Sequence, residues 1–201
     1  MTLRAATGDD LAAIMALERA SFPTDAWSEA MMREELASPH GWYVVDEEAG
    51  RLLGYAGLRA VKSAKDADVQ TIAIAEASRG RGRGRALLRA LLDEARRRGV
   101  VEVFLEVRAD NPVAQALYAS EGFLEIGRKP RYYQPDDVDA VVMKLDLRGW
   151  AAARHPSAPA ESAIRNADDR TLSGADRPQD PESGGTSEFR SGGAWEGGVC
   201  T

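Results

Sequence analysis

A glycine-rich turn in the middle of the chain carries four arginines directly into the start of a helix. Arginine and glycine alternate from Arg79 to Arg85, and residues 86–92 then place leucines at helical spacing. The N-terminus is the positive end of a helix macrodipole, so each arginine there costs roughly 0.3–1 kcal/mol unless an anion lies nearby. The turn therefore predicts an anion-binding site at a helix N-terminus.

Two other interpretations of this turn are a solvated loop and an arginine-glycine segment that binds nucleic acid. The turn lies in mid-domain, joins a predicted strand to a helix and contains no interleaved aromatic residues, which disfavours nucleic-acid binding. Its glycines, Gly80, Gly82 and Gly84, give neither the G-x-G-x-x-G dinucleotide fingerprint nor a G-K-[ST] phosphate loop. The pattern favours a short turn whose backbone N–H groups wrap a pyrophosphate.

Charge and composition divide the chain into a domain and a tail. Residues 1–150 hold 21 basic and 24 acidic residues, whereas residues 151–201 hold 5 and 8 and lack apolar periodicity. Such a segment buries too little surface to offset its ordering entropy. We therefore expect one domain over residues 1–148 and a disordered, acidic Gly/Ser/Pro-rich tail over residues 149–201. The net charge of −6 argues against a direct nucleic-acid partner.

The small numbers of cysteine and histidine residues limit the kinds of catalytic site that the chain can build and the compartment that suits it. Cys200 is the only cysteine, so no intrachain disulfide can form, as is typical of a reducing cytoplasm. His40 and His155 are the only histidines and lie far apart, so we expect no metal and no Ser-His-Asp triad. No apolar stretch resembles a signal peptide or reaches membrane-spanning length. We expect a cytoplasmic protein with no membrane partner, either a monomer or a weak dimer.

Hydrophobic periodicity and turn residues predict alternating strands and helices. Strands are expected at 3–5, 42–45, 52–61, 69–75, 100–107, 123–127 and 138–147, with residues 128–133 as a connection between the last two. The first helix is expected to begin at Thr7 and run through Glu18, with residues 21–25 breaking it. Further helices are expected from 27 to 36, after the arginine-glycine turn to Gly99, and from Pro112 to about 121. Gly54 and Gly57 mark two bulges. This order predicts a single α/β domain, a mixed sheet with helices on both faces.

Several motifs together resemble those of one enzyme family. Residues 71–74, followed by Arg79-x-x-Gly82-x-Gly84 and a helix, resemble the coenzyme A signature of the GNAT acetyltransferases. The runs LEVRADN at 105–111 and ALYxxxGF at 116–123 are similar to the RimI branch of that family. Shorter matches occur at 26–28, 54–57 and 131–133. The resemblance covers residues 2–147 and excludes the tail.

The resemblance implies a largely antiparallel sheet whose two central parallel strands, 69–75 and 100–108, splay apart around acetyl-CoA. It implies that the backbone of one strand pairs with the pantetheine and that the turn holds the pyrophosphate. The residues that it assigns to the cofactor are Ile72, Ala73, Ile74, Arg79, Gly80, Arg81, Gly82, Arg83, Gly84, Arg85 and Asn111. Neighbouring residues of a turn point in different directions, so we expect Arg79 and one or two other arginines to face the phosphates. Asn111 either contacts the cofactor or only caps the next helix.

In RimI-like enzymes a strand glutamate accepts the proton of the acceptor ammonium, and a helix tyrosine protonates the departing thiolate. By motif these residues are Glu106 and Tyr118. An unpaired carboxylate in an apolar strand would be costly. Glu106 could instead pair with Arg108 or face outward, and Tyr118 could simply be a core aromatic residue.

The resemblance further implies acetylation of the N-terminal alanine of a small-subunit ribosomal protein. An α-amine has a pKa near 8 against about 10.4 for lysine, so it is the easier acceptor for a carboxylate base. Trp27 and Tyr132 are candidates for holding the acceptor, although Trp27 could equally anchor a helix. Two alternatives remain open: an acetyltransferase for protein lysine or a small-molecule amine, and a non-catalytic CoA-binding module.

Overall fold

The computed structural model describes residues 1–154. Its strands are β1 (Thr2–Ala5), β2 (Gly41–Glu48), β3 (Arg51–Arg59), β4 (Asp66–Ile74), β5 (Glu102–Arg108), β6 (Leu124–Tyr133) and β7 (Val138–Asp146). Its α-helices are α1 (Leu11–Ser21), α2 (Glu29–Ala37), α3 (Arg83–Arg97), α4 (Pro112–Ser120) and α5 (Leu147–Arg154). Short 3₁₀ helices, η1 (Gly8–Asp10) and η2 (Glu76–Ser78), precede α1 and the arginine-glycine turn. No helix among these residues is long and apolar enough to cross a membrane.

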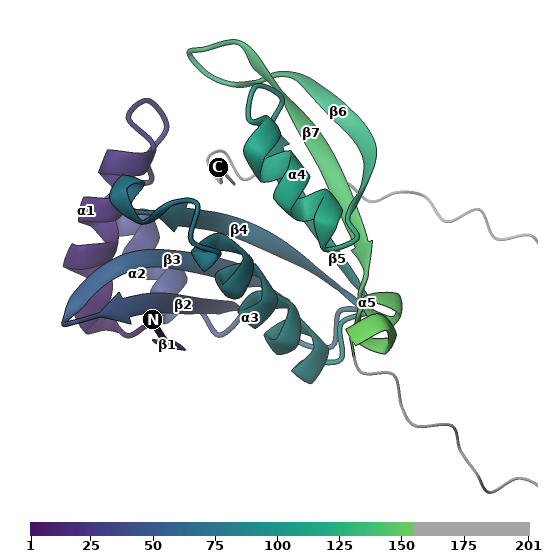
Figure 1. The fold of residues 1–201 in the computed structure, drawn as a ribbon, viewed down its shortest axis with the longest axis horizontal. Coiled ribbons are helices and arrows are strands. Elements are labelled where there is room, and N and C mark those ends of the chain that lie inside the picture. The colour runs from purple at the N-terminus through teal and green to yellow at the C-terminus, as the bar shows by residue number, and fades with distance from the viewer. Residues whose placement is uncertain (155–201) are drawn as a thin grey trace, which may run out of the picture.

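The seven strands form one sheet in the order β1-β2-β3-β4-β5-β7-β6, in which only β4 and β5 are parallel neighbours (Figure 1). Their register contains three pairs, which join Asp66, Ala67 and Asp68 to residues 102–104 of β5. Beyond Asp68 the two strands diverge, and Figure 1 shows them running apart. The predicted fold class, including the splayed central strands, is confirmed.

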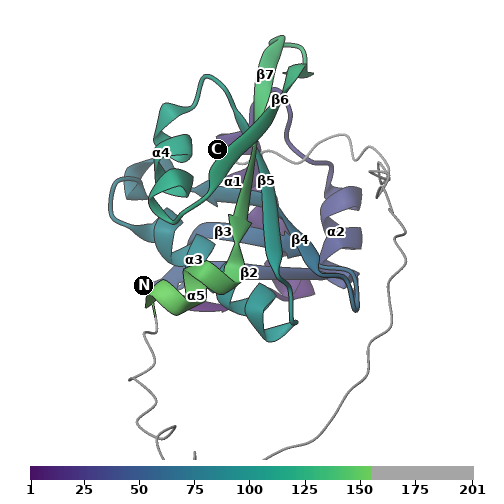
Figure 2. The ribbon, with the colours of Figure 1, turned by 90° about the vertical axis from the view of Figure 1, so that its right-hand side faces the viewer.

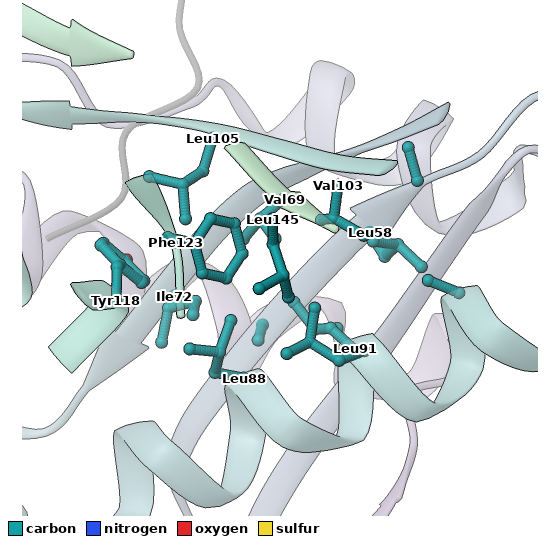
Figure 3. Close-up of a cluster of buried hydrophobic side chains, with 14 of the residues drawn as sticks. Leu58, Val69, Ile72, Leu88, Leu91, Val103, Leu105, Tyr118, Phe123 and Leu145 are labelled. Atoms are coloured by element: carbon teal, nitrogen blue, oxygen red, sulfur yellow. The ribbon is translucent and has the colours of Figure 1, made fainter. Parts of the chain in front are cut away.

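Helices cover both faces of the sheet (Figures 1 and 2). On one face, Leu88 and Leu91 of α3 pack against strand residues and against Phe123, as Figure 3 shows. On the other face, Ile14 of α1 and Met32 of α2 belong to a second buried cluster with residues of β2, β3 and β4. Both clusters also include residues of the β5–β7 half, so apolar packing continues across the gap between β4 and β5.

Two register shifts bend the central strands at the predicted glycines. One lies next to Gly54 in the β2–β3 pairing, and the other follows Gly57 in the β3–β4 pairing. The Tyr43 ring occupies the space that a Cβ at Gly57 would need. Gly57 is therefore required for close packing as well as for the change in register.

The structure corrects two predicted boundaries. Residues 128–133, predicted to be a connection, form the second half of β6 and pair with β7. Residues 149–154, predicted to begin the tail, belong to α5 because Trp150 is buried and donates its Nε1–H to Glu121 (3.3 Å). The folded region thus extends at least to residue 154, and the remaining tail residues lie outside the described residues.

Candidate functional site

The arginine-glycine turn adopts the conformation that its glycines allow. Gly80 and Gly82 have φ angles of 72° and 78°, in the left-handed region that glycine enters without strain. Gly82 is the N-cap of α3, and its carbonyl accepts the N–H of Ala86 (3.0 Å). The N–H groups of residues 80–85 donate to no group within residues 1–154. A row of free N–H groups at a helix N-terminus is a binding site for an anion.

Arg83 is the exception among the four arginines. Its side chain is 7% exposed, and its guanidinium donates to Asp46 (2.6 Å) and Glu48 (2.5 Å) of β2. These hydrogen bonds, Asp46 first, raise the pKa of Arg83. The Arg83 side chain is therefore engaged with β2, and its backbone N–H is the group that it can offer to an anion at the turn.

The side chains of the other three arginines are exposed to solvent, and they differ in how many protein partners they have. Arg79 donates from Nε to the carbonyl of Ile74 (3.2 Å), which ties the turn to the end of β4. Arg85 lies 3.3 Å from Glu121 and so has a protein partner already. Arg81 is exposed and has no hydrogen bond or ion pair with residues 1–154. Arg79 and Arg81 are therefore the side chains best placed to meet an anion at the turn.

The open edge of β4 adjoins this turn. Ile72, Ala73 and Ile74 pair with β3 on one side, while the edge toward β5 has no strand partner beyond Asp68. Backbone groups on an unpaired strand edge can bind an extended chain that carries amides. The structure thus brings together the predicted strand edge and the predicted turn.

Glu106 and Tyr118 lie on opposite faces of the sheet. Leu105 and Val107, the neighbours of Glu106, point into the cluster under α3 and α4, so Glu106 points to the other face. Tyr118 of α4 is 1% exposed and its ring lies 5.9 Å from that of Phe123 (Figure 3). Since Glu106 lies beyond the last β4–β5 pair, the gap between these strands is the direct route from one residue to the other.

Charged and aromatic groups from β6 and β4 surround Glu106. Its side chain is 25% exposed and its Oε1 contacts the Lys129 ammonium of β6, which lies 4.9 Å from the Tyr132 ring centroid. Burial, and then the hydrogen bond with Glu106, raise the pKa of Tyr132. Desolvation by the surrounding protein, followed by the charges of Asp66 and Glu106, raises the pKa of Asp68 to about 6. Glu106 thus belongs to a small acidic group that already holds one cation.

Arg108 is not the partner of Glu106. Its guanidinium forms two hydrogen bonds with Asp110 (3.0 and 2.9 Å) and one with Asp136 (3.0 Å) of the β6–β7 hairpin. Sequence reasoning missed Lys129 and Asp68 around Glu106, because these residues come from β6 and β4 and carry no local motif. Residues 128–133 read Arg-Lys-Pro-Arg-Tyr-Tyr and show no apolar alternation, so no local signal in the sequence placed Lys129 on a strand beside Glu106.

Trp27 and Asn111 both have structural roles. Trp27 is 6% exposed in the cluster under α1 and α2, and its backbone N–H donates to Glu18 (3.0 Å), which favours the helix-anchoring interpretation. Asn111 caps α4 by accepting the N–H of Ala114 at Oδ1 (3.0 Å). Its contact with the cofactor stays a prediction. Residues 1–154 contain no group of three His, Cys, Asp or Glu side chains placed to hold a metal ion.

Comparison with known proteins decides the family. The profile described as the acetyltransferase (GNAT) family matches residues 11–123, more than half of the chain. The chain belongs to the GNAT acetyltransferase family. Among its GNAT relatives, N-alpha-acetyltransferase RimI of Mycobacterium tuberculosis is 44% identical over 124 residues, which cover 61% of this chain and 77% of that protein. A putative [ribosomal protein bS18]-alanine N-acetyltransferase of Bacillus subtilis is 31% identical over 139 residues, covering 69% and 91%.

Solved GNAT structures agree with this membership. The ribosomal-protein-S18-alanine N-acetyltransferase of Escherichia coli superposes with a TM-score of 0.67 at 30% identity, covering 82% of this chain and 99% of that one. The yncA protein of Salmonella typhimurium, a putative acetyltransferase solved with its cofactor acetyl-CoA, gives 0.64 at 26% identity, covering 73% and 94%. The predicted family and its RimI branch are confirmed, and so is the prediction of an N-acetyltransferase.

Proposed function

We propose that this enzyme transfers the acetyl group of acetyl-CoA to the N-terminal α-amine of a protein in the cytoplasm. The acceptor that we infer is the N-terminal alanine of a small-subunit ribosomal protein, in line with the relatives named bS18-alanine N-acetyltransferases. The observation that carries the proposal is the β4–β5 gap with Glu106 on one face and Tyr118 on the other. Glu106, Tyr118 and both strands of the gap belong to one chain, which suits a monomer or a weak dimer.

The structure fits acetyl-CoA at two points. The free N–H groups of residues 80–85 and the exposed Arg79 and Arg81 suit a pyrophosphate, and the unpaired edge at Ile72–Ile74 suits the pantetheine amides. When bound, acetyl-CoA supplies an acetyl group already activated as a thioester.

The protein's own groups then handle two protons. Glu106 accepts a proton from the acceptor ammonium, so that the nitrogen can attack, and Tyr118 is the acid for the departing thiolate. A tyrosine pKa near 10 is reasonably matched to a thiolate of pKa about 8–9. Because the two groups stand on opposite faces, the acceptor approaches from the Glu106 side and the cofactor from the Tyr118 side.

Amine basicity favours an α-amine over lysine. Their pKa values, near 8 and about 10.4, mean that the neutral form of the α-amine is roughly 250-fold more abundant at neutral pH. The acidic group of Glu106, Asp66 and Asp68 attracts a cationic acceptor but does not choose between the two amines. Basicity is therefore the physical argument for an N-terminal acceptor.

The experiment is acetylation of matched peptides followed by mass spectrometry. One peptide begins Ala-Arg, and the second has the same sequence with a blocked N-terminus and one internal lysine. We expect acetylation of the first only. Absence of α-amine acetylation on every Ala-initiated peptide would refute the proposal.

Variants of the two proton-transfer residues test their roles. Glu106→Gln and Tyr118→Phe should each lower kcat far more than they change acetyl-CoA affinity. Glu102→Gln is the matched control, since Glu102 lies on the same face of β5 and pairs with Lys144 (2.9 Å), but beside the closed part of the β4–β5 pairing. Wild-type rates in both site variants would show that the roles are wrongly assigned.

A further inference from the structure

Lys129 reaches the proposed acceptor side of the gap from the edge strand β6. In the β6–β7 register Lys129 lies opposite Ala140, and in the β5–β7 register Glu106 lies opposite Val142. Ala140 and Val142 are two residues apart on β7, so Lys129 and Glu106 project from the same face of the sheet. Their side chains meet there, with the ammonium of Lys129 against Oε1 of Glu106.

The contacts of this ammonium are those expected of a bound amine. A carboxylate gives a charge-assisted hydrogen bond, and an aromatic face 4.9 Å away attracts the cation through its quadrupole. The acceptor of the proposed reaction must bring an ammonium to the same carboxylate before losing its proton. Two ammonium groups cannot occupy the position between Oε1 of Glu106 and the Tyr132 ring at the same time.

We propose that Glu106 and Tyr132 form the binding site for the acceptor's α-ammonium and that Lys129 occupies this site until the acceptor displaces it. The proposal rests on the proposed function. Lys129 is 49% exposed, so its ammonium can rotate into water without leaving a buried charge behind. Binding of the acceptor is then an exchange of one cation for another, and an acceptor end without a positive charge gains nothing at this site.

The Glu102–Lys144 pair helps to separate this role from an ordinary surface ion pair. It joins β5 to β7 on the same face, with side chains 43% and 38% exposed, and no aromatic ring of residues 1–154 forms a cation–π contact with Lys144. Glu102 also lies beside the paired part of β4, where no gap opens. Both pairs join a glutamate of β5 to a lysine on the same face of the sheet, and they differ in their position relative to the gap.

The test compares the binding of two peptides to three forms of the full-length protein. One peptide begins Ala-Arg with a free ammonium, and the other is its N-acetylated form. Calorimetric titration with coenzyme A present in place of acetyl-CoA gives each dissociation constant without turnover. We expect Lys129→Met to bind the free-ammonium peptide about three- to fivefold more tightly than wild type, the range for losing an exposed competing ion pair. The acetylated peptide should bind both forms equally, and Lys144→Met should change neither constant.

Three results would overturn the proposal. Equal tightening for both peptides would mean that Lys129 acts only through the general field, and unchanged or weaker binding of the free-ammonium peptide would mean that it does not compete. A third result uses wild-type protein: an amine-reactive ester should label Lys129 faster when the free-ammonium peptide is bound, and an unchanged rate contradicts displacement. Failure of the proposed function is distinguishable, since it appears as absent α-amine acetylation while these binding measurements stand by themselves.

Discussion

Glu18 of α1 is a fully buried carboxylate at the point where the loop before α2 meets the sheet. Its Oε1 accepts the backbone N–H of Trp27 (3.0 Å), and its Oε2 accepts the hydroxyl of Tyr55 of β3. Burial outweighs both hydrogen bonds and raises the pKa of Glu18 above its ordinary value of 4.5. The native protein therefore retains this proton at pH values where the unfolded chain has lost it, so its stability falls as the pH rises above about 4.5.

Tyr55→Phe should destabilise the protein in a pH-dependent way. The change removes the donor to Oε2 without changing the ring, so no large cavity forms. A hydrogen bond to a charged group contributes roughly 1.5–3 kcal/mol, against about 1 kcal/mol for a neutral pair. We expect a loss of about 2 kcal/mol at pH 8, where the carboxylate is most ionised, and about 1 kcal/mol near pH 5.

Urea denaturation of the wild type and variant across pH 5–8 measures this difference. Combining Tyr55→Phe with Glu18→Gln closes a double-mutant cycle, in which the tyrosine effect should become smaller and independent of pH. A Tyr55→Phe loss under about 0.5 kcal/mol at pH 8, or one that shrinks as the pH rises, would refute the assignment of a charged hydrogen bond.

Three further changes probe the turn, the cap and the last helix. Gly82→Ala should lower the free energy of unfolding by about 1–2 kcal/mol, because the φ angle of 78° strains any residue with a Cβ. The same change should raise the KM for acetyl-CoA severalfold. Gly127→Ala is the control, since a Cβ there meets open space. Asn111→Ala should cost about 1 kcal/mol, whereas Asn111→Asp should restore stability but not acetyl-CoA affinity, and full affinity in both variants would exclude a cofactor contact. Trp150→Ala should lower the free energy of unfolding by about 3–5 kcal/mol, and a loss below about 1 kcal/mol would show that α5 does not stabilise the domain.

The sequence predicted the starts of helices well, because capping residues act within a few positions of the helix that they begin. Thr7 and Asp10 form the capping box before α1, and Asn111 with Pro112 begins α4, as the sequence indicated. The position of β5 was predicted from its run of apolar residues. The same run concealed that buried and partly buried side chains alternate along the strand. Strand β6 was half missed, since it is an exposed edge strand that contains Pro130 and owes its form to pairing with β7.

The sequence predicted the motifs of the candidate site but not the ion pairs that its side chains form with distant residues. Glycine spacing and arginine placement indicated an anion site at the start of α3, because a helix N-terminus acts over a few residues. The burial of Arg83 depends on Asp46, which lies 37 residues earlier on β2. In the same way the Glu106–Lys129 contact spans 23 residues and arises from the order of strands in the sheet. Such pairings follow from tertiary structure, which residue spacing does not encode.

Where β4 and β5 diverge, backbone hydrogen bonding between the two halves of the sheet ends but apolar packing does not. The ladder of backbone hydrogen bonds between them stops after three residue pairs, while two apolar clusters continue across the same boundary. An extended ligand entering there has no ladder to break, because folding has already held the strands apart. It can complete the sheet as an added strand would, so that binding and the cohesion of the two halves reinforce each other. Ligand binding should therefore stabilise the sheet itself. Slower hydrogen exchange of the backbone amides along the edge of β4 that faces β5 would measure this effect.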